Sequence, residues 1–154
     1  MNLEILKNKI NIIQNKFRLG KFDEVIRDAK LLLKKHNNQE ILYNILSIAY
    51  QRKGENYKSI ELLINAIKKS PKNIFLLNNL GTSYYNIKNF SEAENFFKRA
   101  IEIKPDYITA LNNLANLKVD LDLIDEAKEL YKKSIKLNDN IMETHFNLDT
   151  LYQG

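Results

Sequence analysis

The fold of this 154-residue chain is decided by residues 74–107, IFLLNNLGTSYYNIKNFSEAENFFKRAIEIKPDY. Apolar and small side chains form two stripes in this stretch, with Leu77, Leu80 and Tyr84 in the first and Ala93, Phe97 and Ala100 in the second. Spacings of three, four and seven residues place each stripe on one face of an α-helix. The stretch therefore predicts two amphipathic helices joined by a short turn, which is a helical hairpin.

The same pattern recurs along the chain every 34 residues. Leucine or isoleucine returns in one register at Ile12, Leu46, Leu80, Leu114 and Leu148, and proline returns at Pro71 and Pro105. A fixed period of this length is typical of proteins that stack one hairpin on the next. We expect units at about 6–39, 40–73, 74–107 and 108–141, closed by a helix at 142–153.

This register predicts an all-α solenoid of antiparallel helical hairpins that forms a single domain over residues 1–154. The first helices are expected near 5–19, 40–53, 74–87, 108–121 and 142–153. The second helices are expected near 22–35, 56–69, 90–103 and 124–137.

Glycine marks the turn inside the first two hairpins, at Gly20 and Gly54. A residue just past a helix end often takes a positive φ, which glycine adopts without strain. Lys88 and Asp122 stand at the equivalent positions of the later hairpins. We expect the turn to be less demanding there than glycine alone would suggest.

The third unit resembles the tetratricopeptide repeat. The matching residues are Leu77, Leu80, Gly81, Tyr84, Phe90, Ala93, Phe97, Ala100 and Pro105. The resemblance implies a right-handed superhelix whose first helices line a concave groove, and a scaffold that binds another protein or an extended peptide there. The first unit departs most from the family, with Ile13, Val25 and Leu32 at the small positions, as is common for a terminal repeat.

Asparagine recurs on the first helices, where the resemblance places the groove. The candidate groove residues are Asn44, Asn78, Asn79, Thr82, Tyr85, Asn112, Asn113, Asn116 and Asn147. A carboxamide donates and accepts hydrogen bonds, so a row of them can pair with a peptide backbone. The row is similar to the asparagine ladder of O-linked N-acetylglucosamine transferases, although Ile45 interrupts it and asparagine is common throughout the chain.

A second groove chemistry of the family, the carboxylate clamp for acidic chaperone tails, requires basic residues on successive first helices. From the first unit, the corresponding positions hold Ile10, Gln14, Ile45, Phe75 and Asn79. None of these residues is a cation. The corresponding positions are also uncharged when the comparison starts at the second unit. The sequence therefore argues against chaperone-tail binding of this type.

Composition limits the remaining classes of function. The chain has no cysteine, and its two histidines, His36 and His145, have no partner in a catalytic or metal-binding pattern. We expect no catalytic residue, no metal and no cofactor, so the chain should not be an enzyme. No stretch is apolar enough to span a membrane and no signal core is evident, which favours the cytoplasm.

Charge is graded along the chain. Residues 1–39 carry nine basic and four acidic side chains, whereas residues 142–154 carry two acidic ones and no basic one. The basic part could steer an acidic partner or contact nucleic acid, but its lysines are interspersed with apolar residues on helix surfaces, so ordinary solvation is favoured. An RNA-binding helical repeat of the pentatricopeptide type ranks last among the expected functions, because that repeat is one residue longer than the 34 residues found here.

Two questions stay open at the C-terminal end. The chain could be an N-terminal module that recruits substrates for a larger transferase, with a C-terminal domain of the same longer chain as its partner. Asp149 falls where a small residue would meet the missing second helix, and a carboxylate is tolerated there only if that face stays wet. This favours a closing helix, whereas the end within a unit favours a fragment.

Overall fold

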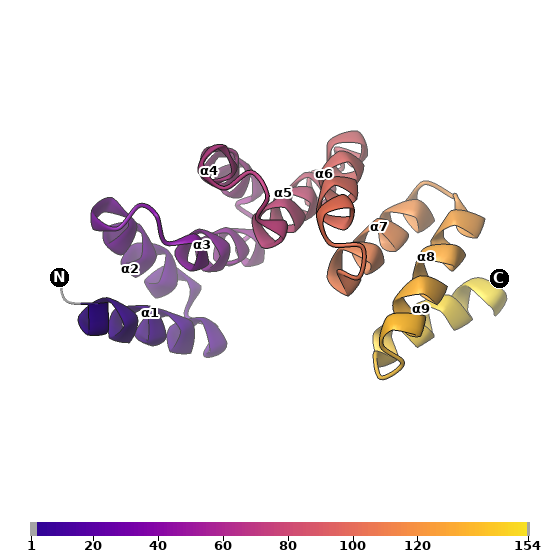
Figure 1. Cartoon of the computed structure of the whole chain (residues 1–154), viewed down its shortest axis with the longest axis horizontal. Helices are drawn as coiled ribbons and strands as arrows, with labels where there is room; N and C mark the ends of the chain where they lie inside the picture. The colour runs from indigo at the N-terminus through magenta and orange to yellow at the C-terminus, as the bar shows by residue number, and fades with distance from the viewer. Residues whose placement is uncertain (1–2, 154) are drawn as a thin grey trace. The chain divides into compact units, whose positions relative to one another are not determined.

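The computed structural model describes residues 3–153, and this range contains nine α-helices and no strand (Figure 1). The helices are α1 Leu3–Arg18, α2 Phe22–Lys35, α3 Glu40–Arg52, α4 Asn56–Lys69, α5 Ile74–Asn86, α6 Phe90–Ile103, α7 Ile108–Asp120, α8 Ile124–Leu137 and α9 Met142–Gln153. Each expected helix is present to within two residues at either end. The all-α hairpin architecture predicted from the repeat is therefore confirmed.

The helices fall into two compact units. Unit 1 comprises residues 1–71 and contains α1 to α4, and unit 2 comprises residues 72–154 and contains α5 to α9. Within each unit, consecutive helices pack against each other in chain order. The single domain over residues 1–154 stays a prediction, and its ends, residues 1, 2 and 154, lie outside the described range.

The turn inside every hairpin contains one residue with a left-handed backbone. Gly20 has φ 70° and Gly54 has φ 74°, and Lys88 and Asp122 follow with φ 63° and φ 60°. The expectation of a less demanding turn in the later hairpins is therefore wrong. Lysine and aspartate take the same strained conformation there, because the backbone must reverse direction within the same number of residues.

Close approach of helices explains the small residues of unit 2. A Cβ atom added to Gly81 on α5 would lie 2.6 Å from Cε1 of Phe97 on α6, which is closer than real Cβ contacts allow. Ala93 and Ala100 on α6 are fully buried. The Phe97 ring thus fills the space that the absent Gly81 side chain leaves.

Ile12 differs from its equivalents in the later hairpins. It is 54% exposed, whereas Leu46, Leu80 and Leu114 are buried. Leu114 on α7 shares a core cluster with Phe97 on the preceding helix α6. No described helix precedes α1, so Ile12 keeps the repeat pattern without the packing partner that the pattern serves.

No helix within residues 3–153 combines the length and the apolar character that crossing a bilayer requires.

Candidate functional site

The predicted groove residues lie on the first helix of each hairpin, as the repeat requires. Asn44 lies on α3 in unit 1, and all the others belong to unit 2. There, α5 carries Asn78, Asn79, Thr82 and Tyr85, α7 carries Asn112, Asn113 and Asn116, and α9 carries Asn147. The polar contacts between α5, α7 and α9 join residues 31 to 35 positions apart, close to the 34-residue period.

One amide pair joins α5 to α7. The Asn113 Nδ2 donates a hydrogen bond of 2.9 Å to Oδ1 of Asn78. Asn78 and its neighbour Asn79 are only 4% and 8% exposed, whereas Asn113 is half-buried. Asn78 is therefore the more deeply buried partner of this pair, and Asn113 is the more exposed one.

A second contact joins α7 to α9. The Asn112 Nδ2 donates to Oγ1 of Thr144 at 2.8 Å, and Thr144 is fully buried. The Oδ1 of Asn112 is itself buried and has no hydrogen-bond partner within the described residues. A buried carbonyl of this kind costs about 1–3 kcal/mol unless water or another donor reaches it. The Asn112 amide is therefore fixed through its nitrogen, whereas its oxygen has no partner within the described residues.

Asn116 is the centre of a third polar contact. Its Oδ1 accepts a hydrogen bond from the hydroxyl of Tyr131 on α8, and Nδ2 of Asn147 on α9 approaches the same oxygen at 3.5 Å. Tyr131 is almost completely buried, and burial raises the pKa of its phenol. The contact fixes the orientation of the Asn116 amide through its oxygen.

Tyr85 lies at the far end of the row and is tied to α7. Its hydroxyl donates a hydrogen bond of 2.5 Å to Oδ2 of Asp120. Burial and, to a smaller extent, this hydrogen bond raise the pKa of Tyr85 to about 12, so the phenol is neutral at physiological pH. Thr82, one turn earlier on α5, donates from Oγ1 to the main-chain oxygen of Asn78 at 3.1 Å.

The structure thus brings the predicted residues of unit 2 into one polar row across three helices. Sequence reasoning placed these residues on the correct helices but did not foresee that they pair with one another, nor that Tyr131, Thr144 and Asp120 complete the row. The signal was present in the spacing. Asn78 and Asn113 are 35 residues apart, as are Tyr85 and Asp120. The spacing within each pair therefore exceeds the 34-residue period by one residue.

The contacts of this row involve neither histidine. His145 Nε2 is 2.9 Å from both the main-chain oxygen and Oδ1 of Asp139, which follows α8. His36 follows the end of α2 in unit 1. Across residues 3–153, no three His, Cys, Asp or Glu side chains are grouped so that they could hold a metal ion.

Known proteins match this arrangement at the level of the repeat. Models of the tetratricopeptide repeat match residues 74–107 and residues 108–141. No curated protein sequence matches the chain.

Solved structures share the fold at low sequence identity. A thermophilic tetratricopeptide-repeat protein of Thermus thermophilus is 19% identical, with a TM-score of 0.87 over 97% of this chain and 82% of its own. MamA of Desulfovibrio magneticus RS-1 is 18% identical, with a TM-score of 0.78 over 95% of this chain and 82% of its own. The first tetratricopeptide-repeat domain of Spaghetti (RPAP3), solved with the HSP90 peptide SRMEEVD, is 22% identical, with a TM-score of 0.69 over 73% of this chain and 90% of its own.

Proposed function

Because the chain belongs to the tetratricopeptide-repeat family, we propose that it is a non-catalytic scaffold that binds an extended peptide segment of a partner protein. The proposed site in unit 2 is the polar row on α5, α7 and α9, and Asn44 on α3 is proposed as a separate candidate contact in unit 1. The observation that carries the proposal is the linked amide row, in which Asn78 and Asn113 share a hydrogen bond of 2.9 Å.

Intramolecular hydrogen bonds prepare these amides for a ligand. A free asparagine side chain loses rotational freedom when it binds, and that loss weakens affinity. Here the contacts to Asn78, Thr144 and Tyr131 already orient Asn113, Asn112 and Asn116, respectively. The half-buried amides of Asn113 and Asn116 can then add a hydrogen bond to a peptide backbone without first becoming ordered, whereas Asn112 has its Oδ1 buried and can offer only its Nδ2.

The ligand is expected to be recognised through its backbone rather than through acidic side chains. The acidic HSP90 peptide is bound by the Spaghetti domain, and we do not extend that ligand to this chain. The positions that would supply the cations of a carboxylate clamp are occupied by uncharged residues such as Phe75 and Asn79. An extended, largely uncharged segment matches the amide row better.

Selection from displayed random twelve-residue peptides tests the proposal. Peptides selected on the wild-type chain should bind the double variant Asn113→Ala/Asn116→Ala at least about tenfold more weakly, which corresponds to about 1.4 kcal/mol. Calorimetry would measure the affinities, and circular dichroism would verify that the variant is folded.

Asn95→Ala is the matched control, because Asn95 is an exposed asparagine on the second helix α6. It should leave the affinity unchanged. Equal binding of the selected peptides to the wild type and to the α7 double variant would show that the amide row is not the site. Failure to select any peptide would contradict extended-peptide recognition altogether.

A further inference from the structure

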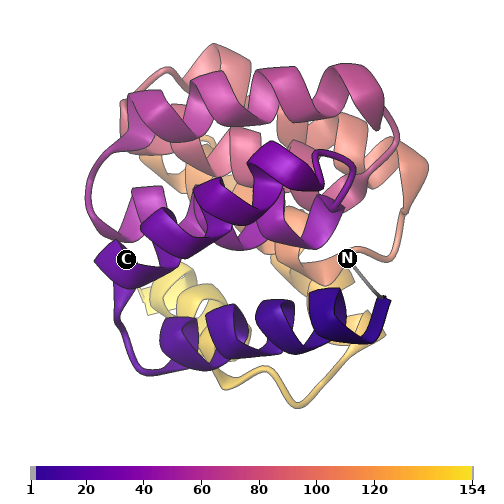
Figure 2. The ribbon, with the colours of Figure 1, turned by 90° about the vertical axis from the view of Figure 1, so that its left-hand side faces the viewer.

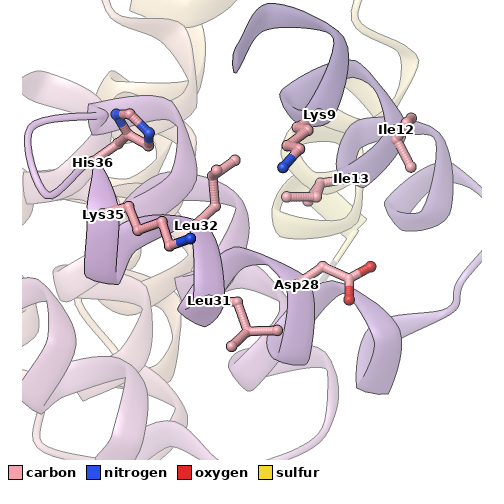
Figure 3. Close-up of a pocket in the computed structure, with 8 residues that line it drawn as sticks. All are labelled: Lys9, Ile12, Ile13, Asp28, Leu31, Leu32, Lys35 and His36. Carbon is pink, nitrogen blue, oxygen red and sulfur yellow. The ribbon is translucent and has the colours of Figure 1, made fainter. Parts of the chain in front are cut away.

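A second candidate site lies in unit 1, between the two helices of the first hairpin. A cleft of about 700 Å³ separates α1 from α2 (Figure 3). Its apolar walls are Ile12 and Ile13 from α1 and Leu31 and Leu32 from α2, and the polar lining residues are Lys9, Asp28, Lys35 and His36. Leu31 and Ile12 are more than half exposed, which is costly for apolar side chains that nothing covers.

The residue types at the helix interface explain why this hairpin is open. Ile13 and Leu32 occupy positions where the third hairpin has Gly81 and Ala100, so larger side chains hold α1 and α2 apart. Lys9 stands where Leu77 fills the third hairpin. In both Figure 1 and Figure 2, α1 and α2 diverge from the loop that joins them.

The charge inside the cleft is positive. Figure 3 shows the ammonium groups of Lys9 and Lys35 directed toward the space between the helices. The one carboxylate in the lining, Asp28, is already bound by Lys16 at 2.7 Å and by Arg27 at 2.9 Å. Neither Lys9 nor Lys35 forms an ion pair with any residue of the described chain. A ligand should therefore combine an apolar surface with carboxylates.

The last helix presents a surface with this chemistry. Thr144 and Leu148 bury one face of α9, and the opposite face carries Met142, Phe146 and Asp149 at helical spacing. Met142 is 86% exposed and Phe146 is 71% exposed. The segment 142–154 has two carboxylates and no basic side chain, so it complements the strongly basic segment 1–39.

We infer that the cleft between α1 and α2 of one copy binds the exposed face of α9 from a second copy. Met142 and Phe146 would cover the walls formed by Ile12 and Leu31, and Asp149 would approach the ammonium groups of Lys9 and Lys35. The contact is heterologous, because it joins two different surfaces. Copies should therefore associate head to tail, and each bound copy leaves one cleft and one α9 face for the next.

Sedimentation velocity on the full chain tests this inference. The wild type should show a mass that increases with protein concentration, and the association should weaken as salt is added, because salt screens the lysine–carboxylate attraction. Two variants separate the surfaces. Lys9→Glu/Lys35→Glu alters only the cleft, and Met142→Ser/Asp149→Lys alters only the α9 face. Each variant alone should bind itself at least about tenfold more weakly than the wild type does.

Mixing the two variants gives the decisive result. The cleft variant keeps a native α9 face and the α9 variant keeps a native cleft, so an equimolar mixture should form a one-to-one complex that does not grow further. A wild type that stays monomeric at millimolar concentration overturns the inference, and so does a mixture that forms no complex.

Two further variants serve as controls, one in the cleft and one on α7. Leu31→Glu places a charge on the exposed apolar wall of the cleft, and it should reproduce the loss if the lysine variant fails to fold. Asn113→Ala/Asn116→Ala lies on α7, and it should leave self-association unchanged even where it abolishes peptide binding. Loss of self-association in this α7 variant would mean that the copies meet through the amide row, which contradicts the cleft.

Discussion

The ammonium group of Lys118 lies 2.9 Å from Oε1 of Glu94, and this ion pair joins α7 to α6 inside unit 2. A second carboxylate, Glu126 on α8, lies 2.9 Å from the same ammonium group. Lys118 is buried, and it occupies the position where the second and third hairpins have Tyr50 and Tyr84. One cation thus connects three helices at a site that the second and third hairpins fill with an aromatic ring, whereas the first hairpin has a lysine there too, Lys16.

Replacing Lys118 should destabilise the chain substantially. Lys118→Ala leaves a cavity and removes the partner of a partly buried carboxylate, and we expect the free energy of unfolding to fall by about 2 kcal/mol. This is less than for a fully buried pair, because Lys98 still contacts Glu94 at 2.6 Å. Chemical denaturation would measure the change. Lys98→Ala, on the exposed side of the same carboxylate, should cost no more than about 0.5 kcal/mol, and equal costs would contradict the role of burial.

The same cluster should make stability depend on pH. Hydrogen bonds from Lys98 and Lys118 hold the pKa of Glu94 below its ordinary value of 4.5. A lowered folded-state pKa stabilises the fold above the unfolded-state pKa, and this contribution is lost as the pH falls through the folded-state pKa. The difference in unfolding free energy between the wild type and Glu94→Gln should be constant from about pH 6 to 8 and shrink below about pH 4.5. A difference that persists unchanged at pH 2 would show that the charge of Glu94 is irrelevant.

Gly81→Ala should destabilise unit 2 by overpacking. The new methyl group would meet the Phe97 ring at 2.6 Å and 2.7 Å, and the main-chain oxygen of Ala93 lies 3.2 Å away. We expect a net cost of about 1–2 kcal/mol in thermal or chemical unfolding, after allowing for the better helix propensity of alanine.

Combining Gly81→Ala with Phe97→Leu tests whether overpacking against the Phe97 ring causes this cost. The smaller leucine side chain should make room for the added methyl group. The double variant should be more stable than the sum of the two single changes predicts, by at least about 0.5 kcal/mol. Additive effects would show that the ring does not limit position 81.

Substitutions at the hairpin turn change stability through backbone strain alone. Gly54 has φ 74°, and no atom lies within 4 Å of a Cβ added there. Gly54→Ala should therefore cost about 1 kcal/mol through left-handed strain only. Asp122→Gly, at the equivalent turn, should stabilise the chain by up to about 0.5 kcal/mol, since aspartate tolerates this conformation better than alanine. Circular dichroism melts would measure both, and a neutral Gly54→Ala would contradict the strain.

The repeat could be predicted from the sequence because its determinants are local or strictly periodic. Apolar residues three and four apart predict the helices. Pro71 and Pro105 end the second helices that precede them, and this effect of proline is local. The polar contacts of the candidate site could not be predicted in the same way. Whether the Asn113 amide meets Asn78 or points to solvent depends on the angle at which α5 and α7 pack, and the identity of the two residues does not determine that angle.

Lys118 illustrates the same limit inside the core. In the sequence it stands where the second and third hairpins have tyrosine, and its two carboxylate partners lie 24 and eight residues away on different second helices. The openness of the first hairpin is a comparable case. Large residues at positions 13 and 32 were visible in the sequence, but the cleft they produce exists only because α1 and α2 cannot approach each other around them.

The sequence by itself determined the helices, their boundaries to within two residues and their 34-residue register, because hydrogen bonding within a helix and burial of an apolar stripe recur in every unit. The tertiary structure alone decided which side chains of neighbouring hairpins touch. It buried Asn78 and Asn79, left Asn113 and Asn116 half-buried, placed the Oδ1 of Asn112 out of contact with solvent, and made an ion-pair centre of Lys118. Those outcomes depend on the distances between helices, which the packing of all the side chains sets together.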